Sequence, residues 1–441
     1  MTLGAPSPPI PRQSLGRAHM LASWLLQEIG RLGLAVDHIV PAGGVRRFAP
    51  DVGSVTLLAI APPEIHALFL RGVAGLQGVR AVVPRDAGGF VAHTDRGGVT
   101  LHVESPEHAG AALVWHTGSR GHIGLLRARA QTFGLAFEAG RLLDAKGRPV
   151  PCASEEALYA RLSLPVIQPE LRHGGDELVL ADEGQLPDLL TGRDIRGDLH
   201  MHTTWSDGRD TLATMVLTAR TLGYEYVAIT DHSEHATSSR TLSRRDVARQ
   251  RAEIEALRDR VDDIAILHGV EVDIMPDGTL DFDDTLLSGF DIVLASLHDD
   301  AGHHPDRLLE RYDAALRHPL VSVITHPANR SPARFPGYAL DYDRLFETAA
   351  ATGTALEVDG APGHLDMDGA LARRAAEAGV TLAVNSDCHR ADALARQMRF
   401  GIGTARRGLV RPEAVLNTRS LEDVQAFVAA KRAGRSPQVP R

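Results

Sequence analysis

The sequence predicts an α/β protein whose C-terminal part is a closed or nearly closed parallel barrel. From Asp194 onward, β-branched runs, polar turns and helical stretches alternate about every thirty residues, which is typical of βα units with parallel strands. The seven strand candidates are IRGDLHMH, YEYVAITDH, IAILHGVEVD, FDIVLASLH, LVSVITHP, GTALEVDG and VTLAVNSDCH. Functional groups in parallel barrels gather where the strands finish, so we expect the site there.

The region before Asp194 is predicted to be α+β. Apolar residues at helical spacing predict an amphipathic helix over about Ser14–Leu32. Four runs of β character follow, in AVDHIVPAGG, VRRFAPDVGSVTLLAIAP, GVRAVVPRDAGGFVAHTD and GVTLHVESPE, and then a helix-rich part. Residues 172–193 are polar and rich in Gly and Asp, which predicts an interdomain linker.

Length and composition set limits on the protein class. A chain of 441 residues predicts two or three domains, and a net charge of −9 argues against a generally basic nucleic-acid coat, although a local basic groove stays possible. Cys152 and Cys388 are the two cysteines, which indicates a reducing compartment. The Pro-rich residues 1–14 predict a disordered lead-in rather than a signal peptide, and no apolar run has membrane-spanning length. We therefore expect a cytoplasmic protein.

Metal-type ligands end six of the seven strand candidates. His200 and His202 alternate along a strand-like run, so both imidazoles point to the same side, and Asp207 follows five residues later. The strand ends carry His200 with His202, His232, Glu271, His298, His326, and Asp387 with His389. Any one of them alone would be better explained as a core histidine or a capping aspartate. Six in succession predict a multinuclear metal centre, and imidazole and carboxylate mixtures suit Mn²⁺, Fe²⁺ or Zn²⁺.

The chain from Asp194 to about Ala429 resembles the polymerase and histidinol phosphatase (PHP) superfamily, and within it the exonuclease domain of bacterial family X DNA polymerases. The matching pieces are HMH with Asp207, TDHSEH, HGVEVDIMPDG, SLH, THPANR, ALEV and NSDCH. The resemblance implies a distorted (β/α)7 barrel of PHP type over residues 194–441.

The resemblance also implies three divalent metal ions, which we expect to be Mn, Zn or Fe. One would be held by His200, His202, Glu271 and Asp387; a second by Glu271, His298 and His326; and the third by Asp207, His232 and His389. All nine positions carry residues competent to bind metal. Such a cluster lowers the pKa of water and polarises a phosphoryl oxygen, so hydrolysis of a phosphate ester is the expected reaction.

Further residues near the ligands have weaker expected roles. The resemblance implies that Arg330 contacts substrate phosphate and is catalytic together with His200, His202, Glu271 and Asp387. Arg240 and Arg390 are weaker candidates that are better explained as surface arginines. Asp231 and Asp273 are expected to orient imidazoles, and Cys388 is expected to face away and pack.

The N-terminal half resembles the palm and thumb of family X DNA polymerases, with a nucleotidyltransferase-like palm over residues 15–105 and a thumb over residues 106–171. The resemblance is carried by Ala42-Gly43-Gly44 with Arg46-Arg47, Gly53 with SVTLLA, Thr117-Gly118-Ser119, Leu164-Pro165 and Pro169-Glu170-Leu171. Under this resemblance, Ser54, Thr56 and Thr100 stand where the family has its metal-binding aspartates, and we expect no lyase or fingers domain before the palm. The palm is therefore expected to be degenerate, without polymerase activity.

Two interpretations of this half stay open. It is either a scaffold that packs on the barrel or a DNA-docking platform, the latter favoured by Arg46, Arg47, Arg120, Arg127 and Arg129 around a Gly-Ser turn and helix start.

The leading hypothesis is a metal-dependent phosphoesterase that acts on DNA ends as a 3′–5′ exonuclease or 3′-phosphatase. The alternatives are a small-molecule phosphomonoesterase such as a histidinol-phosphatase and a non-catalytic DNA-repair scaffold with a structural metal site. Expected partners are DNA ends or a small phosphomonoester, and no membrane.

Overall fold

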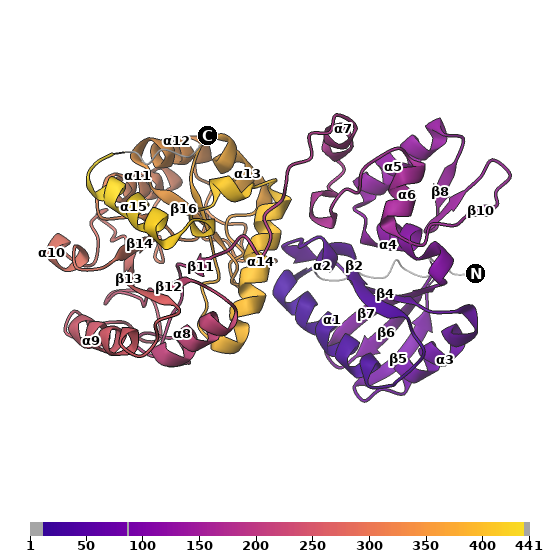
Figure 1. The fold of residues 1–441 in the computed structure, drawn as a ribbon, viewed down its shortest axis with the longest axis horizontal. Helices are drawn as coiled ribbons and strands as arrows, with labels where there is room; N and C mark the ends of the chain where they lie inside the picture. The colour runs from indigo at the N-terminus through magenta and orange to yellow at the C-terminus, as the bar shows by residue number, and fades with distance from the viewer. Residues whose placement is uncertain (1–11, 86–87, 436–441) are drawn as a thin grey trace. The chain divides into compact units, whose positions relative to one another are not determined.

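A computed structural model of the chain describes residues 12–85 and 88–435 and divides the chain into two compact units, Met1–Leu186 and Pro187–Arg441 (Figure 1). Residues 1–11 of the expected lead-in lie outside the described residues. The expected disordered lead-in also included Gln13–Ser14. These two residues instead form β1 and pair antiparallel with β3 (Asp51–Val52). Within residues 12–85 and 88–435, no helix is both long and apolar enough to cross a membrane.

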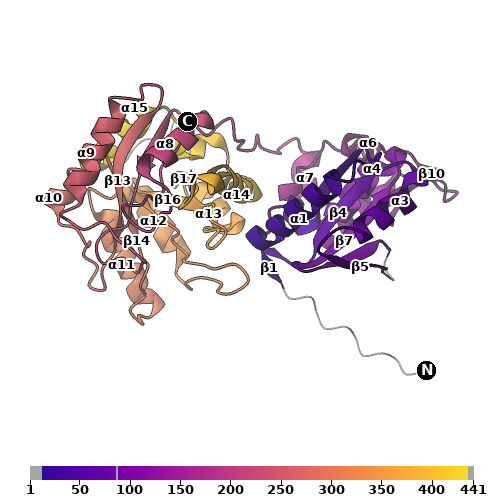
Figure 2. The same ribbon diagram turned by 90° about the horizontal axis from the view of Figure 1, so that it is seen from below.

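The N-terminal unit contains a five-stranded mixed sheet in the order β2-β4-β7-β6-β5. Its strands are β2 (His38–Ala42), β4 (Val55–Ile60), β5 (Val79–Pro84), β6 (Phe90–Thr94) and β7 (Gly97–Glu104). The helices beside it are α1 (Leu15–Gly30), α2 (Gly43–Arg46) and α3 (Pro63–Ala74), and α1 runs alongside β4 (Figure 2). The pair β4–β7 is parallel and the other pairs are antiparallel.

A smaller helical part follows in the same unit. It comprises α4 (Ala109–Thr117), α5 (Arg120–Thr132), α6 (Glu155–Arg161) and a sheet of β8 (Ala136–Glu138), β9 (Arg141–Leu143) and β10 (Pro149–Val150). The side chains of Ser119 and Ser154 accept hydrogen bonds from first-turn amides of α5 and α6, so a hydroxyl caps each helix. Leu58 and Ile60 of β4 pack against Ala109 and Ala112, which joins α4 to the sheet.

The segment expected to be a linker contains a helix, α7 (Glu177–Asp182). Glu177 is buried, accepts hydrogen bonds from the amides of Gly174 and Gly175, and lies 2.9 Å from Nδ1 of His122 on α5. The first part of this segment is therefore held to the N-terminal unit.

The C-terminal unit is the predicted seven-stranded barrel, and its strands are parallel and follow chain order. They are β11 (Gly197–Asp198), β12 (Tyr226–Ile229), β13 (Ala265–Asp273), β14 (Ile292–Ser296), β15 (Val323–Ile324), β16 (Ala355–Asp359) and β17 (Leu382–Asn385). A parallel bridge between Met201 and Cys388 joins the chain beyond the first strand to the chain beyond the last. Asn417 donates to the carbonyls of Gly197 and Val384, so a side chain helps to close the ring between β11 and β17.

Helices surround these strands (Figure 1). They are α8 (Leu212–Thr221), α9 (Val247–Arg258), α10 (Asp284–Leu287), α11 (Pro305–Arg317), α12 (Tyr342–Thr352), α13 (Gly369–Glu377), α14 (Leu394–Arg407) and α15 (Leu421–Arg432). Alternate strand residues face the two sides of the barrel wall: Val227 and Ile229 join the core beneath the helices, whereas Tyr226 and Ala228 join an inner cluster with Phe427 of α15. This packing fixes the strand ends that present the site.

Candidate metal centre

The ligand-type side chains lie at the carboxyl ends of the barrel strands. They are His200 and His202 after β11, Asp207 in the following turn, His232 after β12, Glu271 on β13, His298 after β14, His326 after β15, and Asp387 and His389 after β17. His200, His202 and Glu271 are fully buried. A parallel bridge pairs His232 with Glu271, so the backbone itself brings two of these residues together.

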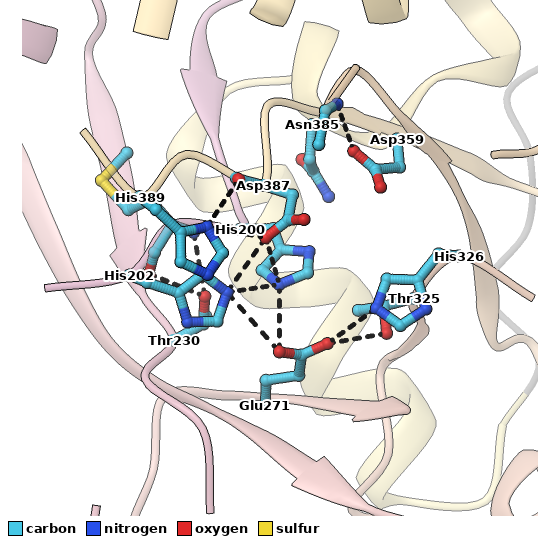
Figure 3. A network of polar contacts seen from close by, with 12 residues as sticks. His200, His202, Thr230, Glu271, Thr325, His326, Asp359, Asn385, Asp387 and His389 are labelled. Atoms are coloured by element: carbon cyan, nitrogen blue, oxygen red, sulfur yellow. Dashed lines mark hydrogen bonds and ion pairs between the residues drawn. The ribbon is translucent and has the colours of Figure 1, made fainter. Parts of the chain in front are cut away.

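Glu271 stands at the middle of the cluster (Figure 3). Its Oε2 lies 2.8 Å from Nδ1 of His232, 3.4 Å from Nε2 of His200 and 3.5 Å from Nε2 of His202. Its other oxygen, Oε1, lies 3.1 Å from Nε2 of His326 and 3.5 Å from Nε2 of His298. One carboxylate is thus positioned to bridge two groups of imidazoles.

Two aspartates extend the cluster. Oδ1 of Asp387 lies 3.1 Å from Nε2 of His202 and 3.5 Å from Nε2 of His200, and Oδ1 of Asp207 lies 3.2 Å from Nε2 of His389. Ser238 donates a 2.6 Å hydrogen bond to Oδ2 of Asp207, which fixes that carboxylate. All nine side chains therefore belong to one continuous network.

The sets of ligand atoms within reach of one ion differ in part from the groups that the resemblance implies. Three sets have all atoms within 4.8 Å of one another: His202 with Asp207, His232 and His389; His200 with His202 and Glu271; and His232 with Glu271 and His298. His202 and His232 thus reach two groups each, while His326 meets the cluster through Oε1 of Glu271.

The unsatisfied polar atoms of the cluster fit divalent cations. Within the described residues, Nδ1 of His202 is buried without a hydrogen-bond partner, and Nδ1 of His232 and Oε2 of Glu271, although 2.8 Å apart, do not meet hydrogen-bond geometry. Nε2 of His202 lies 3.0 Å from Nε2 of His200, close enough for both nitrogens to bind one cation. Buried polar atoms are costly unless paired, so this arrangement is that of a metal site rather than of a packed core.

The electrostatics of the cluster also favour bound cations. Burial alone would raise the pKa of Glu271, but the imidazoles of His200, His232 and His298 outweigh burial and hold that pKa well below its usual range. Burial, with His389 and His232 nearby, lowers the pKa of His202 to about 3. Against the opposing effect of burial, Glu271 and Asp273 raise the pKa of His298 to about 10, and Asp387 and Asp207 raise that of His389 to about 9, so the metal-free cluster holds protons that a bound cation would displace.

Sequence patterns missed the residue that orients His200. Glu357 on β16 is fully buried, and its Oε1 lies 2.8 Å from Nδ1 of His200, while its Oε2 accepts the amide of His326. The signal was the acidic residue inside the apolar run GTALEVDG, the one strand candidate without an assigned ligand. Imidazoles that ligate metal usually donate their other N–H to such a carboxylate.

Asp198 was also missed. It is fully buried, and its Oδ1 accepts hydrogen bonds from the amides of His200 and Ser386. Burial raises its pKa to about 6. Asp198 thereby holds the segments that carry His200 and Asp387 against each other. Asp387 and His326 adopt positive φ angles of 48° and 26°, a strained conformation often found at functional sites.

The two expected orienting aspartates behave differently. Oδ1 of Asp273 lies 3.0 Å from Nδ1 of His298, as expected. For Asp231 the expectation was wrong: its carboxylate accepts hydrogen bonds from Thr203, Ser206 and Gln250 rather than from an imidazole, because it stabilises the turn after His202.

The remaining named residues are placed as follows. Arg330 is largely buried, and its Nη1 pairs with Asp368 at 3.1 Å. Arg240 donates to backbone carbonyls of the turn that carries Asp207, and Arg390 pairs with Asp392. Cys388 is buried within the hydrophobic core.

The N-terminal unit contains a cavity of about 620 Å³ between the palm-like and thumb-like parts. Arginines line it together with glycines and the start of α5: Arg12, Arg47, Arg120 and Arg127, with Gly43, Gly44, Gly53, Gly118 and Gly124. Asp51 is the acidic residue of this lining. Guanidinium groups and a helix N-terminus attract phosphate.

Two of the arginines that were expected to dock DNA are engaged internally. Arg46 forms a two-pronged ion pair with Glu155, with both distances 2.7 Å, and Arg129 pairs with Asp182. The hydroxyls of Ser54 and Thr100 lie 3.0 Å apart, and Thr56 pairs with Thr100 across β4 and β7.

Fold and site together define a (β/α)7 barrel protein with a cluster of histidines and carboxylates that is able to hold metal. Residues 198–359 match the family model of the PHP domain, and residues 112–173 match that of the DNA polymerase beta thumb. Part of the C-terminal unit is therefore similar to PHP domains, and part of the N-terminal unit is similar to the thumb of DNA polymerase beta.

Similar proteins agree with both matches. The chain is 38% identical over 332 residues to the DNA polymerase/3′-5′ exonuclease PolX of Bacillus subtilis, which covers 75% of this chain and 58% of that protein. It is 28% identical over 241 residues to a probable phosphatase of Syntrophotalea carbinolica, covering 52% of this chain and 95% of that protein. A probable phosphatase of Caldanaerobacter subterraneus is 28% identical over 256 residues, covering 53% of this chain and 91% of that protein.

Proposed function

We propose that this protein is a metal-dependent phosphoesterase that hydrolyses DNA 3′ ends, as a 3′–5′ exonuclease or a 3′-phosphatase. The observation that carries the proposal is the position of Glu271, whose two oxygens face five imidazoles at the carboxyl ends of the strands. Multi-metal centres of this composition suit in-line displacement at phosphorus.

The centre would hold three divalent ions, Mn, Zn or Fe, on the nine side chains from His200 to His389 described above. When bound, such ions activate water and stabilise the charge that develops on a phosphoryl oxygen. Arg330 is proposed to contact the substrate phosphate from the loop after His326. Cys152 and Cys388 are free and buried, which is typical of a protein in a reducing compartment. This supports a cytoplasmic location.

The attached N-terminal unit supports DNA as the substrate. Arg120 and Arg127 are exposed at the arginine-lined cavity, where the first turn of α5 also begins. This cavity would dock the DNA backbone through phosphate contacts, which position a duplex without reading its sequence. Polymerase activity would be absent because Ser54, Thr56 and Thr100 cannot hold two Mg²⁺ ions.

A second candidate is a small-molecule phosphomonoesterase. Two relatives named probable phosphatases favour it. Each matches about half of this chain over more than 90% of its own length. The same metal chemistry would then act on a substrate that needs no contact with the N-terminal unit.

One assay separates these functions. The full chain with Mn²⁺ is tested side by side on 3′-recessed DNA, 3′-phosphorylated DNA and histidinol phosphate, with His200→Ala as the inactive control. We expect the parent to hydrolyse a DNA substrate and to hydrolyse histidinol phosphate only weakly. The double variant Arg120→Glu with Arg127→Glu should hydrolyse the DNA substrate more slowly. Preference for histidinol phosphate would establish the second candidate, and DNA binding without any hydrolysis would indicate a scaffold.

A further inference from the structure

His364 lies on the loop between β16 and α13 and belongs to none of the predicted ligand sets. The loop forms a tight turn in which the amides of His364 and Leu365 donate to the carbonyl of Ala361 at 3.0 and 2.8 Å. Asp366, two residues further on, is buried and accepts the amides of Ala328 and Arg330 at 3.0 and 2.9 Å. The loop is therefore fixed to the segment that directly follows His326.

The imidazole of His364 stands beside the metal centre. It stacks on the ring of His326, with centroids 5.0 Å apart and planes 17° from parallel. Since Nε2 of His326 lies 3.1 Å from Oε1 of Glu271, His364 borders the cluster on the side of His326. The near-parallel stack on His326 fixes the plane of the His364 ring.

The two nitrogens of this ring differ in environment. In the part of the chain that the structure describes, Nδ1 is buried without a hydrogen-bond partner, whereas the side chain as a whole is partly exposed. A buried unpaired N–H is more costly than a buried lone pair, so the ring proton belongs on Nε2, which is not among the buried unpaired atoms of the described residues. Within the described residues no hydrogen bond involves the side chain of His364, so Nε2–H is available to a ligand.

We propose that His364 is a catalytic residue that binds substrate: Nε2–H donates a hydrogen bond to a non-bridging oxygen of the phosphoester at the metal centre. The proposal rests on the proposed phosphoesterase function. It does not depend on a change of protonation, because Nε2 carries a proton in the charged ring as well. A fixed donor aimed at the phosphoryl group stabilises the charge that grows there during displacement.

The experiment compares four variants of the full, Mn²⁺-loaded chain. In His364→Gln the side-chain amide nitrogen can take the place of Nε2, whereas in His364→Asn it can take only the place of Nδ1. His364→Ala removes both donors. His318→Ala is the matched control, because His318 ends α11 and pairs with Asp284. The readouts are kcat on bis(4-nitrophenyl) phosphate, the Kd of inorganic phosphate by calorimetry, and bound metal per chain.

We expect kcat to fall about 100-fold in His364→Ala and His364→Asn, and less than about tenfold in His364→Gln. Phosphate binding should weaken about tenfold in the alanine and asparagine variants, as expected for a lost hydrogen bond to a charged group. Metal content should equal that of the parent in every variant, and His318→Ala should behave as the parent.

Unchanged kcat and phosphate affinity in His364→Ala would overturn the proposal, as would equal effects of asparagine and glutamine or a loss of bound metal. The proposed function and the proposed contact of His364 are tested separately. If the parent hydrolyses nothing but its phosphate affinity still depends on His364, the proposed function fails and the contact stands. If the parent is active and all His364 variants match it, the contact fails alone.

Discussion

Nδ1 of His200 lies 2.8 Å from Oε1 of Glu357, and both side chains are fully buried. This contact turns Nε2 of His200 towards Glu271 and Asp387. The same carboxylate accepts hydrogen bonds from Asn385 and from the amide of His326. One glutamate on β16 therefore aligns groups from three other strands of the barrel.

Replacement of Glu357 should weaken metal binding without removing a ligand. Glu357→Leu should lower the affinity for Mn²⁺ about 10–100-fold, because His200 loses its orienting partner. Glu357→Gln keeps an acceptor oxygen and should have a smaller effect. Titration calorimetry measures both, with the exposed Glu347→Gln on α12 as control. Equal affinity in Glu357→Leu and the parent would show that the contact does not support the site.

Replacement of Glu271 should be more severe than replacement of Glu357. Glu271→Gln keeps the size of the side chain but removes the charge that faces both groups of imidazoles. We expect at least one metal ion fewer per chain and at least about 100-fold lower hydrolysis. Elemental analysis by mass spectrometry and a steady-state assay test this, and full metal content in the variant would contradict a bridging role.

Metal removal should destabilise the C-terminal unit. The ligands bring buried carboxylates and imidazoles together, and an ion that binds the folded state alone stabilises it by about 2.7 kcal/mol at 100 times its Kd. Adding Mn²⁺ to chelator-treated protein should therefore raise the melting temperature by about 5–10 °C. His200→Ala should lose most of this response, and an equal rise in that variant would place the binding elsewhere.

Glu155 should give the N-terminal unit a pH-dependent stability. Burial alone would raise its pKa, but Arg46 and Arg172 outweigh burial and lower the pKa to about 2 from 4.5. The carboxyl is thus more acidic when folded, so its contribution of about 3 kcal/mol is complete above pH 4.5 and is lost as the pH falls towards 2. Glu155→Gln should destabilise strongly at pH 7 and much less at pH 3.

Chemical unfolding followed by tryptophan fluorescence measures this difference, because Trp24 and Trp115 lie in the N-terminal unit, while the third tryptophan, Trp205, lies in the C-terminal unit and contributes equally in parent and variant. Glu138→Gln, at an exposed position on β8, serves as control. A destabilisation by Glu155→Gln that does not change with pH would contradict the ion-pair explanation.

The salt dependence of DNA binding should reveal phosphate contacts at the arginine-lined cavity. Arg120→Ala combined with Arg127→Ala should weaken binding and reduce the slope of log affinity against log salt by up to about 2. Fluorescence anisotropy at several salt concentrations gives the slope. Arg80→Ala, at an exposed position paired with Asp95, should leave it unchanged. Equal slopes in all variants would assign DNA binding to another surface.

The sequence predicted the barrel well because the period of strands, turns and helices is local. The same holds for residues such as His232, His298 and His326, which come directly after apolar runs. It could not predict contacts between distant segments. Glu357 lies 157 residues from His200, and nothing in the run GTALEVDG shows which partner its carboxylate meets.

The same limit explains the arginines of the N-terminal unit. The sequence predicts that Arg46 docks DNA. In the folded chain, however, Arg46 forms an ion pair with Glu155, which lies 109 residues away in the sequence. Asp231 likewise stands next to His232 in sequence, but its carboxylate turns to the segment after His202 because those amides need an acceptor.

Anomalous X-ray diffraction from crystals of the Mn²⁺-loaded full chain tests the central claim most directly. The account predicts anomalous peaks beside Glu271 at the carboxyl ends of the barrel strands, three per chain, each within bonding distance of His or carboxylate atoms from His200 to His389. Peaks at scattered surface positions, or none near Glu271, would contradict it.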